Sequence, residues 1–236
     1  MSALAIHGGE KAVTMEQSEA LRWPIITDEE ISAVVELMRK GELSISETTY
    51  KFEEEFAAYH GVKHALAHNN GTAAIHTALF AVGVGAGDEV IVPPLPYWAV
   101  AMPVLTCNAV PVFCDVDPVH FCPDPKDIER RITPQTKAIL VVHNDGMPTE
   151  MDAVMDIAHK HNLPVIEDCS RAHGASYKGK KVGTIGDIGC FSLQTSKLMV
   201  GGEGGVLITN NTAYYERAVC LGHYERIEHL PNEQLH

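Results

Sequence analysis

The sequence has no apolar run approaching the roughly 20 residues that a membrane-spanning helix requires. Its N-terminus, MSALAIHGGEKAV, also lacks the basic region and long apolar core that mark a secretory signal. Basic residues are in deficit, since 18 Lys and Arg stand against 31 Asp and Glu, for a net charge of −13. A nucleic-acid surface needs a basic face. We therefore expect a cytoplasmic protein that binds neither a membrane nor a nucleic acid.

Cysteine is scarce, and none of the six cysteines belongs to a CxxC pair. The chain of 236 residues is too long for a disulfide scaffold, so we interpret the cysteines as reduced, mostly buried thiols. The 13 histidines are scattered without spacing such as HExxH, so no metal site is predicted. The glycine fingerprints GxGxxG and GxxxxGK[ST] are absent, which argues against an NAD-binding or P-loop protein.

What the sequence does contain is a repeated pattern of a short apolar run, a turn and a helical period. The candidate strands are residues 64–67, 89–93, 110–116, 138–142, 164–168, 189–193 and 204–210. Several are apolar on both faces, which is typical of strands that are covered on both sides. Alternating strands and helices predict right-handed crossovers between parallel strands. We therefore predict a three-layer α/β/α fold around a mostly parallel central sheet of roughly seven strands.

Helix signals flank these strands. The segment ITDEEISAVVELMRKGEL opens with Thr27 and Glu30, a capping-box pair, and stops at Gly41. The segment PTEMDAVMDIAHKHN has Thr149 as its expected N-cap. A further helix is expected in ETTYKFEEEFAAYHG. We predict that residues 1–60 form an N-terminal helical segment, whose helices need not belong to the core of the sheet.

Three features fall at carboxyl ends of predicted strands, where open α/β sheets bind their ligands. Gly71 and Thr72 follow a strand and open a helix, whose free N–H groups attract a phosphate. Asp168 ends the strand PVIED and offers a counter-charge for a cation. Lys197 lies between an apolar run and four glycines. In a cleft its pKa would fall, and the neutral amine could condense with an aldehyde.

Each feature taken alone has a simpler explanation. Many helices begin with a plain strand-to-helix turn, a carboxylate at a strand end commonly caps the next helix, and a loop lysine is usually solvated. Together, however, they fit pyridoxal 5'-phosphate, which needs an anion site, an anionic partner for its pyridine nitrogen and a lysine for its aldehyde. Asp168 would keep the ring nitrogen protonated, and Lys197 would hold the cofactor and move protons.

With these motifs in order, the chain resembles the DegT/DnrJ/StrS-type sugar aminotransferases, pyridoxal-phosphate enzymes of fold type I with an aspartate-aminotransferase-like fold. The resemblance runs from LAIHGGEKAV through HNNGTAAIHTAL and GVGAGDEVIVPPLPYWAV to GEGGVLITNN. It implies that Lys197 is the Schiff-base lysine and that Gly71, Thr72 and Ser192 hold the cofactor phosphate.

The same resemblance makes Asp168 the pyridinium partner and places Tyr97 where an aromatic ring stacks on the pyridine. Trp98, one residue further, is the less expected stacker. Arg171 stands where the family often has a glutamine that bonds the phenolic oxygen of the cofactor. The arginine would supply that donor, or turn outward to meet a substrate carboxylate or phosphate. Pro96 replaces a common threonine, which removes a donor and stiffens the loop.

The resemblance also implies a domain organisation and an activity. Residues 61–222 would be a pyridoxal-phosphate-binding large domain, and residues 223–236 the start of a linker to a small C-terminal domain that this sequence does not reach. The implied enzyme is a homodimeric aminotransferase. It would move an amino group from glutamate or glutamine to a nucleotide-linked keto-sugar or a keto-cyclitol, in amino-sugar, antibiotic or cell-surface polysaccharide biosynthesis.

Three other functions stay open. One is a non-catalytic regulatory module that binds the cofactor, and another is an aminohydroxybenzoate synthase of the same family. The third is a cofactor-dependent sugar dehydratase. Dehydratase relatives carry histidine in place of the lysine, so Lys197 argues against that function.

Overall fold

The computed structural model describes residues 3–44 and 46–230. The chain divides into two compact units, Met1–Glu42 and Leu43–His236, each with its own internal contacts. Among the described residues, no helix combines the length and the apolar character needed to cross a membrane.

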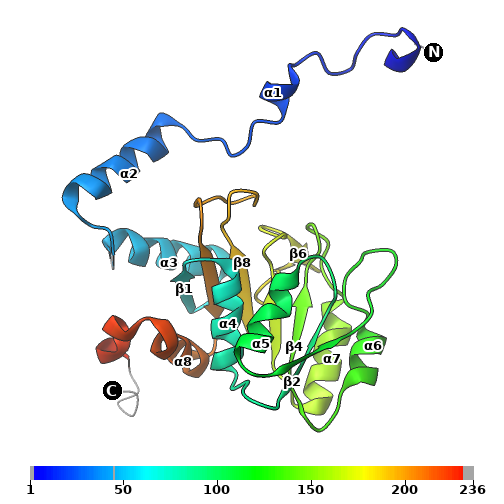
Figure 1. Ribbon diagram of the computed structural model, residues 1–236, viewed down its shortest axis with the longest axis vertical. Coiled ribbons are helices and arrows are strands. Elements are labelled where there is room, and N and C mark those ends of the chain that lie inside the picture. Colours follow the sequence, from blue (N-terminus) through cyan, green and yellow to red (C-terminus); the bar gives the residue numbers. More distant parts are fainter. Residues whose placement is uncertain (1–2, 45, 231–236) are drawn as a thin grey trace. The chain divides into compact units, whose positions relative to one another are not determined.

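In the described residues of the first unit, the elements of regular structure are helices (Figure 1). They are η1 (Ala5–His7), α1 (Gln17–Ala20) and α2 (Asp28–Lys40). The capping box predicted at the start of α2 is confirmed, because the Thr27 side chain and Glu30 satisfy backbone donors reciprocally. The helix ends at Gly41, whose φ of 73° is the left-handed conformation that glycine adopts without strain.

The second unit is built on a seven-stranded sheet with the order β1-β9-β8-β5-β4-β2-β3. Its strands are β1 (His64–His68), β2 (Glu89–Val92), β3 (Val110–Phe113), β4 (Thr136–Val142), β5 (Val165–Asp168), β8 (Ile188–Ser192) and β9 (Gly205–Thr209). All seven predicted strands are confirmed. A separate hairpin pairs β6 (Ser176–Tyr177) with β7 (Lys180–Lys181).

One strand, β9, runs antiparallel to both of its neighbours, β1 and β8. The other pairings in the sheet are parallel. The remaining six strands therefore point the same way, and their carboxyl ends share one edge of the sheet with the start of β9. Side chains that follow different strands meet at this edge, which is where ligands bind in open α/β sheets.

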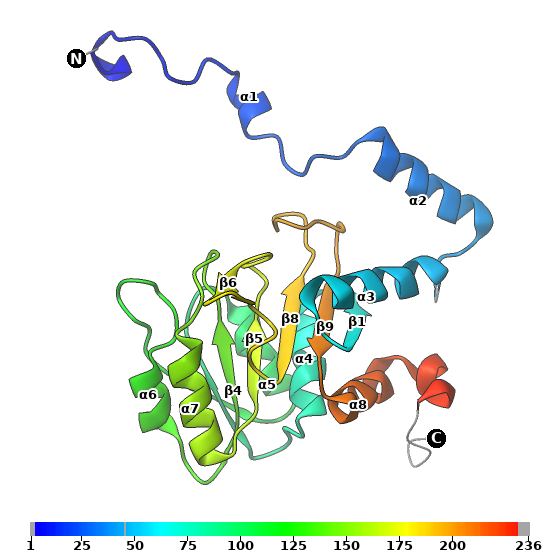
Figure 2. The same ribbon diagram turned by 180° about the vertical axis from the view of Figure 1, so that it is seen from behind.

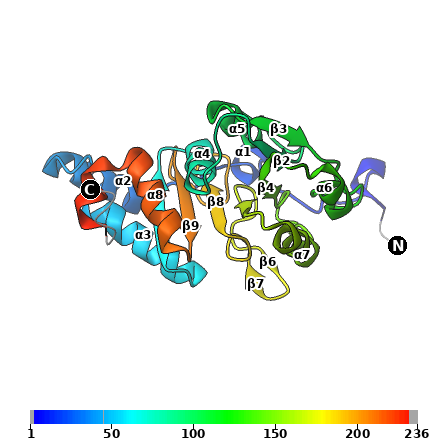
Figure 3. The same ribbon diagram turned by 90° about the horizontal axis from the view of Figure 1, so that it is seen from below.

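Helices cover both faces of the sheet (Figures 2 and 3). Those of the second unit are α3 (Glu47–His60), α4 (Gly71–Ala81), η2 (Trp98–Val100), α5 (Met102–Thr106), α6 (Pro125–Arg131), α7 (Met151–His161), α8 (Thr212–Gly222) and η3 (Tyr224–His229). Buried residues of α4, α5 and α8 form one core with the sheet. On the opposite face, α3 forms a second core beside β1, β8 and β9, and α6 and α7 form a third beside β2, β4 and β5. The predicted three-layer fold is confirmed.

Helix α3 contributes to the core of the sheet unit, because Phe56 and Ala57 are buried against Ala65 and Val206. The division between the two compact units falls between Glu42 and Leu43. The functional domain limits expected from the sequence, residues 61–222 with flanking segments, stay a prediction. The last six residues of the expected linker lie outside the described part of the chain.

Thr149 is not an N-cap, so that expectation is wrong. The N-cap of α7 is Glu150, which makes no side-chain capping bond. The Thr149 hydroxyl donates instead to the Val142 carbonyl at 2.9 Å, and its backbone N–H donates to His143 Nδ1 at 3.1 Å. These buried bonds tie the segment before α7 to the end of β4, and they outweigh the local capping preference.

Candidate functional site

A cavity of about 600 Å³ opens at the carboxyl edge of the sheet, within the usual size range of small-molecule sites. All the site residues predicted from the sequence line it: Gly71, Thr72, Tyr97, Asp168, Arg171, Ser192 and Lys197. They come from the ends of β1, β5 and β8, from the loop after β2, and from the loop between β8 and β9. That last loop projects beyond the sheet edge (Figure 2). The structure thus brings together residues far apart in the chain.

The turn between β1 and α4 is packed backbone against backbone. The Asn70 side chain caps α4 by accepting from the Ala73 N–H at 2.8 Å. A Cβ on Gly71 would lie 2.7 Å from Ser192 Cβ, and a Cβ on Gly205 would collide with the Asn70 carbonyl oxygen. The first N–H groups of a helix have no partner within it. This turn therefore presents backbone donors and the helix dipole to an anion in the cavity.

Asp168 ends β5 and is only 7% exposed. Its Oδ1 accepts the Ser170 N–H at 2.9 Å. Burial raises the pKa of this carboxyl, while the bonds from Ser170 and the charge of Lys197 act in the opposite direction. A cation bound beside Asp168 would favour the carboxylate further.

Lys197 lies in the loop between β8 and β9, which backbone bonds hold closed. Leu193 N–H donates to the Gly204 carbonyl at 2.8 Å, and Thr195 N–H donates to the Gly202 carbonyl at 3.1 Å. Burial lowers the pKa of the Lys197 amine, and the charge of Arg171 lowers it further, against the opposing effect of two aspartates. The amine that faces the cavity is thus easier to deprotonate than an ordinary lysine.

Two aromatic side chains lie at the rim of the cavity. The planes of the Tyr97 and Trp98 rings are inclined by 41° to each other, and the ring centroids are 5.0 Å apart. Tyr97 is 50% exposed and Trp98 is 58% exposed. Pro96 precedes them and also lines the cavity. The Tyr97 ring therefore presents a flat aromatic face at the cavity.

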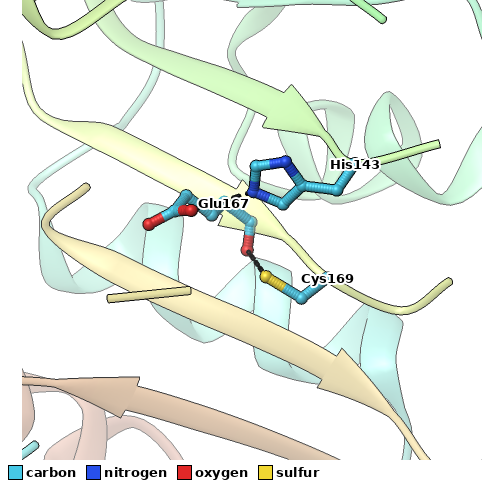
Figure 4. Close-up of side chains that lie close together, drawn as sticks. All are labelled: His143, Glu167 and Cys169. Carbon is cyan, nitrogen blue, oxygen red and sulfur yellow. Dashed lines mark hydrogen bonds and ion pairs between the residues drawn. The ribbon is translucent and has the colours of Figure 1, made fainter. Parts of the chain in front are cut away.

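His143 and Glu167, the residue before Asp168 in the chain, form a buried network (Figure 4). His143 Nε2 lies 2.8 Å from Glu167 Oε2, and both side chains are fully buried. Because the His143 Nδ1 accepts from Thr149, the ring proton resides on Nε2 and is donated to Glu167. The His143 backbone N–H donates to the Asp168 carbonyl at 3.1 Å, so the network fixes the end of β5.

His143, Glu167 and Cys169 lie close enough together for a metal site, but their chemistry does not fit one. Glu167 also accepts from backbone N–H groups of Gly183, Ile185 and Gly186. Both of its oxygens and both His143 nitrogens are thus already hydrogen-bonded. Burial raises the pKa of the Cys169 thiol well above its ordinary value, whereas metal binding needs the thiolate.

Several polar residues that line the cavity were not singled out by sequence reasoning: Asn70, Ser170, Gln194, Ser196 and Glu203. The available signal was their position, because each lies in a loop that follows a predicted strand. Arg171 has a partner that sequence reasoning also missed. Its Nη1 donates to Asp145 Oδ1 at 2.8 Å, and Asp145 lies in the loop after β4.

The family model of the DegT/DnrJ/EryC1/StrS aminotransferases matches residues 24–228. This chain belongs to that family. Over 226 residues it is 44% identical to the L-glutamine:2-deoxy-scyllo-inosose aminotransferase of Streptomyces lividus, covering 93% of this chain and 53% of the relative. It is 50% identical over 168 residues to the GDP-perosamine synthase of Caulobacter vibrioides, covering 71% of this chain and 45% of the relative.

Solved structures of the aminotransferase family agree with this fold. An aminotransferase from Psychrobacter cryohalolentis matches with a TM-score of 0.82 and 42% identity, over 84% of this chain and 51% of that chain. A 3-amino-5-hydroxybenzoic acid synthase matches with a TM-score of 0.80 and 39% identity, over 84% and 52%. The chain therefore spans about half the length of the relatives that it matches.

Proposed function

We propose that this chain is the cofactor-binding part of a pyridoxal-phosphate-dependent aminotransferase. The enzyme takes an amino group from glutamine and gives it to a keto-cyclitol or a keto-sugar. The observation that carries the proposal is the convergence of Lys197, Asp168 and the Gly71–Thr72 turn on one cavity. Relatives named as glutamine-dependent cyclitol aminotransferases support the donor and the acceptor class.

The residues present fit the cofactor. The Gly71–Thr72 turn and Ser192 would hold its phosphate, in a cradle that a Cβ on Gly71 would fill. The buried carboxylate of Asp168 would pair with the ring nitrogen, and Tyr97 would lie against the ring face. Lys197 would hold the aldehyde carbon. Solved relatives that carry the pyridoxamine form of the cofactor support this assignment.

When bound, pyridoxal phosphate would supply an electron sink, which stabilises the negative charge left when the α-carbon of the donor loses its proton. Lys197 then acts on the proton. With its pKa lowered, the neutral amine would take the proton from the α-carbon of the donor and deliver it to the cofactor carbon that ends up carrying the amino group. Asp168 would hold a proton on the ring nitrogen, and the buried network of His143 and Glu167 would keep Asp168 in position.

The first experiment follows the absorption spectrum of the purified, cofactor-loaded protein when an amino donor is added. L-glutamine is expected to convert the bound cofactor from the aldehyde to the amine form, and a keto-cyclitol or keto-sugar is expected to reverse the change. Lys197→Ala should remove the colour of the attached cofactor while leaving the fold intact. A spectrum that no amino donor alters would favour the non-catalytic module and sink the proposal.

An aminohydroxybenzoate synthase is the second candidate, favoured by the match to a solved enzyme of that name with a TM-score of 0.80. An acceptor panel separates the two. Keto-cyclitols and keto-sugars should restore the aldehyde form, whereas the second candidate predicts that only a cyclic precursor of the aromatic amino acid does so. Use of glutamate in place of glutamine, a homodimeric assembly and a cytoplasmic location stay predictions.

A further inference from the structure

Arg171 is a positively charged residue that lines the cavity, and the proposed function gives it no role. In the described part of the chain, the cavity is lined by two Lys or Arg side chains, Arg171 and Lys197. Lys197 is committed to the cofactor in the proposed function. The resemblance implies a neutral glutamine at this position, whereas Arg171 lines the same cavity as Lys197 and its charge lowers the pKa of that amine.

The one side-chain partner of Arg171 among the described residues is weakly held. Its Nη1 donates to Asp145 Oδ1 at 2.8 Å, with side-chain exposures of 38% and 67%. A guanidinium has five N–H donors arranged to grip a carboxylate with two parallel bonds. An ion pair this exposed contributes little to stability, so Arg171 can exchange Asp145 for another anion at small cost.

Asp145 is nevertheless held near Arg171. Its loop starts from the buried His143 and is closed by the Met147 N–H, which donates to the Asn144 carbonyl at 2.8 Å. Asp145 itself has a φ of 47°, in the left-handed region that aspartate tolerates better than most residues. The loop therefore keeps the carboxylate beside the Arg171 guanidinium while it remains exposed to water.

The position of Arg171 selects among the anions that a substrate could bring. In an amino-acid donor, the α-carboxylate is bonded to the same carbon that carries the amine. That carboxylate must therefore lie close to Lys197 when the amine reacts. The phosphates of a nucleotide-linked sugar lie beyond the sugar ring, further from the reacting carbon, and a keto-cyclitol carries no charge. A cation that shares the cavity with Lys197 suits the donor carboxylate best.

We propose that Arg171 is a specificity-determining residue that binds the α-carboxylate of the amino-acid donor. Asp145 occupies the guanidinium in the donor-free site and is released to water when the donor enters. This inference rests on the proposed function. It predicts opposite effects for the two members of the pair, since loss of Arg171 removes a donor contact and loss of Asp145 removes a competitor.

Steady-state kinetics with L-glutamine and an acceptor test the inference, because ping-pong kinetics give a separate KM for each substrate. Arg171→Gln should raise the KM for glutamine about tenfold or more, since a charge-assisted bond is lost. Asp145→Asn should lower that KM, and neither variant should change the KM of an uncharged acceptor. Lys178→Gln is the matched control, because Lys178 forms an exposed ion pair with Asp152 and does not line the cavity.

A binding measurement makes the inference independent of turnover. Glutaramate is glutamine without its amine, and pentanediamide replaces the remaining carboxylate with a neutral amide, so neither can react with the cofactor. By calorimetry, the cofactor-loaded protein should prefer glutaramate, and Arg171→Gln should abolish the preference. Failure to turn over glutamine would count against the proposed function, while this preference would still report on Arg171.

Three results would overturn the inference. Arg171→Gln could retain the full preference for glutaramate. It could alter the absorption of the bound cofactor with the KM for glutamine unchanged, which would place Arg171 on the phenolic oxygen. It could instead raise only the KM of a nucleotide-linked acceptor, which would assign Arg171 to an acceptor phosphate.

Discussion

Gly71 and Ser192 are in such close contact that a Cβ on the glycine would lie 2.7 Å from the Cβ of the serine. Gly71 opens α4 and Ser192 ends β8, so the helix N-terminus rests directly on a strand end. The same side chain would also meet the Ser170 hydroxyl at 3.3 Å. Any side chain at position 71 would therefore push these three segments apart.

Gly71→Ala is therefore expected to destabilise the protein and weaken cofactor binding together. The added methyl group must displace Ser192 or the start of α4, which costs about 1–3 kcal/mol in a well-packed region. Urea unfolding measures the stability, and titration with pyridoxal phosphate measures the binding. Gly85→Ala is the control, because a Cβ there meets nothing within 4 Å. Equal behaviour of the two variants would contradict the close packing.

Asp168→Asn should change stability in opposite directions with and without the cofactor. Because burial raises the folded-state pKa above the ordinary 3.8, the stabilising contribution of the protonated carboxyl is present below that value. It is lost as the pH rises through the raised pKa. Asparagine does not ionise, so the cofactor-free variant should be more stable than wild type at pH 7, with no such gain in acid.

In the cofactor-loaded protein the order should reverse, since the carboxylate then has a cationic ring nitrogen beside it. Thermal unfolding of both forms, recorded at several pH values, checks the two signs. A cofactor-free variant that is less stable than wild type at pH 7 would show that the burial of Asp168 is not a net cost.

Glu167→Gln should be costly, although it keeps the size of the side chain. Both Glu167 oxygens accept hydrogen bonds, from the His143 ring and from three backbone N–H groups. An amide NH₂ would confront donors at one of these positions, which leaves buried groups unpaired at about 1–3 kcal/mol or more. Urea unfolding measures the loss, with the exposed Glu54→Gln as control. A stability equal to that of the control would contradict the network.

We expect the folded protein to lose stability in mild acid because of His68. Burial, with the positive charges of His223 and Arg226, lowers its pKa from 6.5 to about 3. Its depressed pKa gives a stabilising contribution that is fully present above pH 6.5 and is lost as the pH falls toward 3. The expected slope is at most about 1.4 kcal/mol per pH unit from this group.

His68→Gln should flatten the dependence of the free energy of unfolding on pH between those two values, as measured by urea unfolding. The same substitution at the exposed His7 should leave the slope unchanged. A slope that His68→Gln does not alter would assign the acid sensitivity to other half-buried histidines, such as His173 and His223, whose pKa values burial also lowers.

Local signals in the sequence were sufficient to predict most of the helices and strands. The capping box at Thr27 and Glu30 involves residues three apart, so the sequence alone contains the whole interaction. The Thr149 prediction was wrong because its hydroxyl found a buried carbonyl at the end of β4. The antiparallel direction of β9 could not be predicted either, because an apolar run of residues does not indicate the direction of its strand in the sheet.

The site followed the same division. Lys197, Asp168 and the Gly71–Thr72 turn were predicted to share a cavity because each follows a strand, and they do share one. The partner of Arg171 could not be predicted, because Asp145 lies in another loop with no motif around it. The tight contact of Gly205 with the Asn70 carbonyl likewise depends on the pairing of β1 with β9.

That pairing also sets when the protein can first take up its cofactor during synthesis. His64 of β1 lies opposite Thr209 of β9, so β1 cannot complete its pairing until β9 has been synthesised. Nearly all strands of the sheet must leave the ribosome before Ser192 and Gly205 can pack against the turn at Gly71. Binding of pyridoxal phosphate would thus require the completed sheet. A nascent chain stalled before β9 would not bind the cofactor and would lack its absorption.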